Sequence, residues 1–165
     1  MDKSMDVYAA YCVDEDIRLK SSSGGMITIL AEHVLDQGGV VYGVAMSDDC
    51  YAAEFIRVTD RNGLEKIRGS KYLQAKVGDT FRRVKEDLES GRTVLFTGTG
   101  CQVNGVKAYL GKSYEKLYCV DVICHGAPSP ELWREYVEFR EREYSSKVTY
   151  CLLYTSDAAD DMQCV

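Results

Sequence analysis

Long apolar runs, basic stripes and internal repeats are all missing from this chain of 165 residues. The longest apolar runs, such as residues 40–46, are far shorter than the roughly 20 residues that cross a bilayer, so we expect no membrane span. A net charge of -6 without a basic stripe argues against nucleic acid as the main partner. The polar, acidic residues 1–6 predict no secretory signal, and we therefore expect a cytoplasmic protein.

Disulfides are not expected either, although the chain has seven cysteines. Cytoplasmic thiols stay reduced, so these cysteines are better explained as free thiols, metal ligands or core residues. Cys119 alternates along a predicted strand and is expected in the core, whereas Cys12 and Cys50 match no motif. The length of the chain fits a single domain.

Predicted strands alternate with predicted helices, which indicates an α/β fold with a mixed, largely parallel sheet flanked by helices. The hydrophobic pattern places strands at residues 6–12, 40–46, 54–59, 93–97 and 117–123. It places helices at residues 27–35, 77–88, 103–110 and 131–142, the last with Ser129 as N-cap and Pro130 in its first position. Residues 60–63 are expected to form a turn.

The Gly-x-Gly-x-x-Gly pattern of Rossmann dinucleotide-binding proteins is incomplete in this chain. Gly98 and Gly100 supply the first two glycines, but Val103 stands where the third is needed. The fold is therefore expected to be non-Rossmann in detail.

Two glycine-rich turns carry the strongest chemical signal, one within residues 94–103 and the other within residues 121–130. In each, a predicted buried strand stops at a turn that contains a cysteine, and a helix starts just beyond. Such a turn directs free backbone N–H groups and a positive helix end at one point, which suits an anion and favours a thiolate. Both turns are expected at the carboxyl edge of one sheet, where open α/β proteins bind ligands. This arrangement favours a cofactor-binding redox protein.

Two further loops contain polar side chains suited to phosphate. Residues 21–25, Ser-Ser-Ser-Gly-Gly, are either a flexible helix entry with a serine N-cap or a cradle for a pyrophosphate. Lys71 is the cation of the second motif loop. It is either a solvated surface lysine or a charge that compensates a phosphate.

Four sequence blocks resemble the β-subunit family of coenzyme F-420 (deazaflavin) hydrogenases and dehydrogenases, over residues 8–139. They occur in family order as Ser21-Ser-Ser-Gly-Gly25, Gly69-Ser-Lys-Tyr72 with Gln74, Gly98-Thr-Gly-Cys-Gln102 and Cys124-His-Gly-Ala-Pro-Ser129. The resemblance implies an oxidoreductase subunit that binds FAD and a 4Fe–4S cluster. Such a subunit moves electrons between the cluster and a hydride-accepting substrate such as a deazaflavin. Its partner would be ferredoxin or an iron–sulfur or hydrogenase-type subunit.

The resemblance also implies roles for particular residues. Cys101 and Cys124 would be cluster ligands, and Lys71 and His125 would act in catalysis. The charge of Lys71 would stabilise the reduced, anionic flavin. His125 could tune the cluster through a hydrogen bond or merely cap its turn. The residues expected around FAD are Ser22, Ser23, Gly24, Gly25, Ser70, Lys71, Tyr72, Thr97, Gly98, Thr99 and Gln102.

Two departures from the family pattern matter. Gly100 stands where the family usually has proline, which frees φ and leaves the loop less preorganised. A cubane cluster needs about four thiolates, but the motifs supply only Cys101 and Cys124. We therefore expect this chain to hold no complete cluster and to be inactive alone.

The end of the chain has a different character. Residues 151–161 resemble the translated read-through of a sequencing adapter, so residues 151–165 are expected to be a non-native tail. Residues 1–150 would then be the N-terminal portion of a flavin and iron–sulfur domain.

Two alternatives stay open at this stage. The same turns could serve a non-catalytic phosphate- or nucleotide-binding module in which the cysteines are inert. Cys101 could instead be the nucleophile of a thiol enzyme, since it is expected at a helix start.

Overall fold

A computed structural model describes residues 6–153 and 162–164. Its helices are α1 (Glu15–Leu19), α2 (Met26–Asp36), α3 (Arg61–Ile67), α4 (Thr80–Glu89), α5 (Gly100–Leu110) and α6 (Pro130–Tyr144). Its strands are β1 (Val40–Met46), β2 (Ala53–Val58), β3 (Val94–Thr99), β4 (Leu117–Val122), β5 (Cys151–Leu153) and β6 (Met162–Cys164). None of the helices in this described part combines the length and apolar character that crossing a bilayer requires.

The main sheet has four strands in the order β2-β1-β3-β4. β1 pairs antiparallel with β2 and parallel with β3, and β3 pairs parallel with β4. The prediction of a mixed, largely parallel sheet flanked by helices is therefore confirmed. The short strands β5 and β6 form a separate antiparallel pair.

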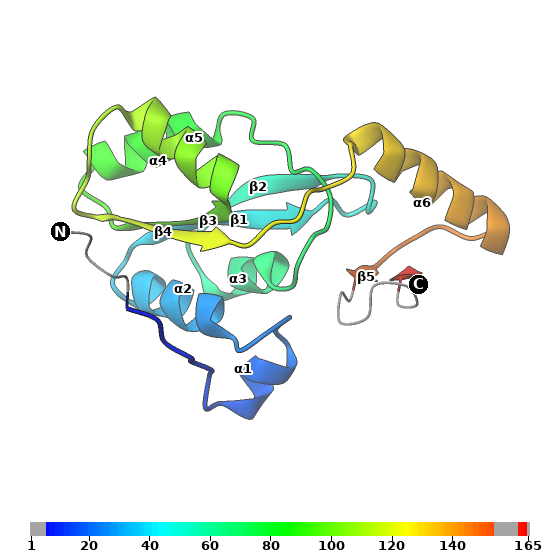
Figure 1. The fold of residues 1–165 in the computed structure, drawn as a ribbon, viewed down its shortest axis with the longest axis horizontal. Coiled ribbons are helices and arrows are strands. Elements are labelled where there is room, and N and C mark those ends of the chain that lie inside the picture. Colours follow the sequence, from blue (N-terminus) through cyan, green and yellow to red (C-terminus); the bar gives the residue numbers. More distant parts are fainter. Residues whose placement is uncertain (1–5, 154–161, 165) are drawn as a thin grey trace.

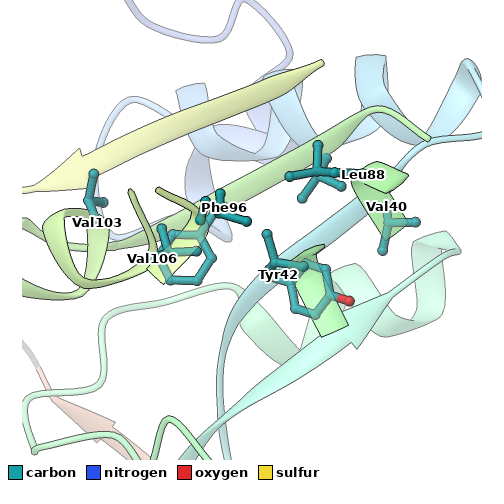
Figure 2. Packing of buried hydrophobic residues seen from close by; sticks show 9 residues of the cluster. Val40, Tyr42, Leu88, Phe96, Val103 and Val106 are labelled. Carbon is teal, nitrogen blue, oxygen red and sulfur yellow. The ribbon is translucent and has the colours of Figure 1, made fainter. Parts of the chain in front are cut away.

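Helices cover both faces of the main sheet (Figure 1). On one face, α4 and α5 pack over β1 and β3, and the core there includes Tyr42, Phe96 and Val106, all at most 1% exposed (Figure 2). On the other face, α2 and α3 cover Val41 and Leu95. Alternate residues of β1 and β3 thus point to opposite faces, as period 2 requires, and the two central strands are buried on both sides.

Helix α6 lies beyond the carboxyl end of β4 and projects from the sheet (Figure 1). Its N-terminus matches the prediction, because the Ser129 hydroxyl accepts a hydrogen bond from the backbone N–H of Leu132 at 3.2 Å and Pro130 is the first helical residue. Trp133 of α6 is buried in a third apolar cluster, and its indole N–H donates to the Cys50 carbonyl at 2.8 Å.

Three local predictions are wrong, and one helix was missed. Residues 6–12 form no strand, because they lie outside the sheet and only Cys12 among them is buried. The expected turn at residues 60–63 is the first turn of α3, where the Asp60 carboxylate caps the N–H of Gly63 at 2.7 Å. The helix expected from Val77 starts at Thr80, and α1 was not anticipated.

Candidate functional site

A cavity of about 280 Å³ brings together two of the four motif blocks. Its wall is formed by residues 21–28, residues 67–70, Ala10, Leu64 and Val122. Val122 is the last residue of β4, so the cavity lies at the carboxyl edge of the sheet. Ligands of open α/β proteins bind at this edge.

The N-terminus of α2 opens into this cavity without a side-chain cap. The N-cap is Gly25 in the left-handed conformation, with φ of +79°, and the alternative of a serine N-cap is therefore wrong. The first turn of α2 contains no acidic residue. The first backbone N–H groups of a helix have no partner within the helix, so the end of α2 presents donors and a positive dipole to an anion.

A hydrogen bond joins the serine block to the second motif loop. The Ser22 hydroxyl accepts from the backbone N–H of Ser70 at 2.9 Å, and both residues line the cavity together with Ser23. Gly24 has no room for a side chain, since a Cβ there would lie 2.9 Å from the Ala10 carbonyl oxygen. These contacts fix the shape of the cradle.

Lys71 occupies a different position from the one expected for a solvated lysine. Its ammonium donates to the carbonyl oxygens of Lys66 at 3.2 Å, Arg68 at 2.5 Å and Gly69 at 3.0 Å. Burial lowers the pKa of Lys71 to about 8, while the three acceptors favour its charged form. The side chain therefore fastens the end of α3 to the loop that follows.

The third block lies at the junction of β3 and α5. Thr97 and Gly98 are buried within β3, and the Thr97 hydroxyl donates to the Tyr42 carbonyl at 3.3 Å. Thr99 is the N-cap of α5, and its backbone N–H donates to the Gln102 side chain at 3.0 Å. The side chains of Thr97 and Gln102 thus make structural contacts, and their predicted role around FAD stays a prediction.

Gly100, which stands where the family usually has proline, lies close to an acidic side chain. A Cβ at Gly100 would lie 3.1 Å from a carboxylate oxygen of Asp121. Asp121 pairs with Gly98 across β3 and β4, so its carboxylate lies beside the start of α5. The sequence reasoning passed over this acidic residue.

Cys101 and Cys124 follow neighbouring strands at the same edge of the sheet. Thr99 of β3 pairs with Val122 of β4, and each cysteine comes two residues after one member of that pair. Both cysteines are exposed. Cys124 was expected to follow a buried strand, but it lies beyond β4, and β4 is only partly buried. Its sulfur accepts a hydrogen bond from the backbone N–H of Gly126 at 3.3 Å.

A complete cubane cluster does not fit the described part of the chain. Residues 6–150 contain no group of three or more His, Cys, Asp or Glu side chains that could hold a metal ion. Two exposed thiols fall short of the usual four ligands, so the cluster role of Cys101 and Cys124 stays a prediction.

The remaining predicted residues lie apart from the cavity. His125 is exposed next to Cys124, and Tyr72 packs against the cluster around Trp133. Cys119 is half-buried against the α4–α5 core, where burial raises the pKa of its thiol. Arg68, in contrast, lines the cavity although no motif singled it out.

The fold and the cavity define an α/β protein with a cavity at the carboxyl edge of a largely parallel sheet. Two family models cover most of the chain: "Coenzyme F420 hydrogenase/dehydrogenase, beta subunit N-term" matches residues 7–81, and its C-terminus counterpart matches residues 91–159. The chain belongs to the coenzyme F420 hydrogenase/dehydrogenase β-subunit family, as the sequence resemblance implied.

The proteins that are similar to the chain include one curated relative and one solved structure. The coenzyme F420-dependent sulfite reductase of Methanocaldococcus jannaschii is 24% identical over 111 residues, which cover 67% of this chain and 17% of that protein. A solved structure of the F420-reducing [NiFe] hydrogenase complex from Methanosarcina barkeri matches with a TM-score of 0.65 and 22% identity. That match covers 88% of this chain and 53% of the other, and it supports the fold alone.

Proposed function

We propose that the cavity binds the diphosphate part of FAD, and that the chain is the flavin-binding portion of an oxidoreductase subunit. The observation that carries this proposal is the cavity itself, in which the uncapped start of α2 and the loop at Ser70 surround one volume. A volume of about 280 Å³ suits part of a dinucleotide. Membership of the family supports a flavin as the ligand.

The proposed reaction is electron transfer between a hydride-accepting deazaflavin and an iron–sulfur partner, either ferredoxin or a hydrogenase-type subunit. A bound flavin can exchange a hydride on one side and single electrons on the other. The protein's own part is to hold the phosphates at the α2 N-terminus and to present Cys101 and Cys124 at the same sheet edge.

A fluorescence titration of the purified chain with FAD tests this proposal. Binding at micromolar concentration, with riboflavin binding more weakly because it lacks phosphate, is the expected result. Absence of FAD binding would contradict it. Binding of FAD without any electron transfer to ferredoxin, in a protein extended to the full length of its relatives, would favour the alternative of a non-catalytic nucleotide-binding module.

The thiol-enzyme alternative receives less support. Cys101 lies in the first turn of α5, and its sulfur lies 3.1 Å from the Thr99 hydroxyl, which is no base at neutral pH. An adjacent base such as histidine is one common means of activating a nucleophilic thiol, and this contact does not supply one.

A further inference from the structure

The cavity needs a cation if it holds a phosphate, and Lys71 is poorly placed to supply it. All three N–H donors of an ammonium are matched by the three carbonyl oxygens that surround the Lys71 nitrogen. An anion could reach this nitrogen only by displacing those contacts. Gly69 and Ser70 of the predicted loop line the cavity, whereas the Lys71 ammonium contacts backbone carbonyl oxygens.

Arg68 comes three residues earlier and lines the cavity directly. Its side chain is 12% exposed, and one terminal nitrogen donates to a Glu65 carboxylate oxygen at 2.6 Å. The Nε atom is buried and has no hydrogen-bond partner within the described residues. A buried, charged donor without a partner is costly, and native proteins normally satisfy such groups with a water molecule or a ligand.

The start of α2 forms another part of the wall of the same cavity. Residues 25–28 present the start of α2 there, with no side-chain cap on the helix and no acidic residue in its first turn. A phosphate between these groups could accept hydrogen bonds from the helix amides on one side and from Arg68 on the other. Glu65 need not move, because its side chain is 58% exposed and stays on the other edge of the guanidinium.

We propose that Arg68 binds the phosphate of the ligand in this cavity, while Lys71 only holds the loop in place. This inference rests on the proposed function, since it names the residue that recognises the diphosphate part of FAD. A guanidinium presents its N–H groups as a planar fork that matches two phosphate oxygens, which an ammonium cannot do.

Isothermal titration of the full chain with FAD and with inorganic pyrophosphate tests the proposal. R68Q is expected to weaken both affinities about 10- to 100-fold, because a hydrogen-bonded charge contact is lost. R68K keeps the charge but loses the planar fork, and it is expected to weaken both affinities less than R68Q does. If far-UV circular dichroism shows that R68Q does not fold, R68K is used in its place. R61Q is the matched control, since Arg61 is the first residue of the helix that ends just before Arg68. The Arg61 side chain is 66% exposed and pairs with Asp36 and Glu32, which do not line the cavity.

The outcomes separate this inference from the proposed function. If the wild type binds FAD and both Arg68 variants bind it equally well, Arg68 has no such role and the flavin site still stands. If the wild type binds pyrophosphate through Arg68 but does not bind FAD, the anion site is supported and the proposed function fails. If the wild type binds neither probe, both are overturned.

Discussion

Substitution of Gly25 by alanine tests whether the cradle depends on the left-handed turn before α2. Gly25 has a φ of +79°, which costs an L-residue about 1–2 kcal/mol. The new Cβ would also lie 3.1 Å from the Cβ of Cys12, and this tight contact adds about 1 kcal/mol. The expected loss in the free energy of unfolding is therefore about 2–3 kcal/mol.

Gly38 offers a matched control at the other end of the same helix. It has a φ of +71°, but a Cβ there would have no neighbour within 4 Å. Gly38→Ala should therefore cost only about 1–2 kcal/mol. Because Gly38 lies away from the cavity, FAD affinity should stay at the wild-type value in Gly38→Ala and fall in Gly25→Ala.

Urea denaturation followed by far-UV circular dichroism measures the free energy of unfolding of both variants, with linear extrapolation to water. FAD titration of the folded proteins measures the effect on the cavity. Two results would refute the reasoning: a Gly25→Ala protein no less stable than Gly38→Ala, or a loss of FAD affinity in the Gly38 variant alone.

Three other predictions concern the core, the loop lysine and the cysteines. Tyr42→Phe should lower the free energy of unfolding by about 1.5–3 kcal/mol in urea denaturation, because the Tyr42 hydroxyl donates to the buried Asp87 carboxylate at 2.6 Å; an unchanged midpoint would contradict this. Folding lowers the pKa of Lys71 from 10.5 to about 8, so the unfolded chain binds the extra proton between these values and stability should rise with pH there. Urea denaturation at several pH values should show the free energy of unfolding of the wild type rising by about 1–3 kcal/mol more than that of Lys71→Met over this range. Parallel pH profiles of the two proteins would argue against this reasoning. Mass spectrometry after brief alkylation at neutral pH should find the exposed Cys101 modified and the buried Cys12 intact, and the reverse order would be incompatible with the fold.

The central part of the fold follows from simple patterns in the sequence. β1 is a continuous apolar run and β3 begins with the apolar residues 94–96, which indicates strands buried on both faces. Helix α6 has a serine N-cap followed by proline. Both signals depend only on neighbouring residues, so these elements could be predicted from the sequence alone. The order of the strands was only broadly predictable, because pairing depends on how the helices cross between strands.

The errors have a common physical cause. Residues 6–12 contain apolar side chains that suit a strand, but no neighbouring strand pairs with them, and Val7 and Tyr8 remain exposed. The Asp60–Gly63 segment has the composition of a turn, and the same capping contact that makes a turn also starts a helix. In both cases long-range packing decides between local alternatives.

The candidate site was predictable as a set of loops but not as a set of side-chain directions. The resemblance pointed to the serine block and to Ser70, which do meet at the cavity. It could not tell that the Lys71 ammonium turns back onto backbone carbonyls while Arg68 lines the cavity, because that choice depends on how α3 ends.

Amide chemical shifts of the ¹⁵N-labelled, 18.5 kDa chain, recorded by NMR during titration with FAD, test the central claim most directly. The account predicts the largest shift changes at the backbone amides of residues 24–28 and of Gly69 and Ser70, which line the cavity. Changes confined to other regions, such as α6 or the β2 edge of the sheet, would contradict a ligand site at the start of α2.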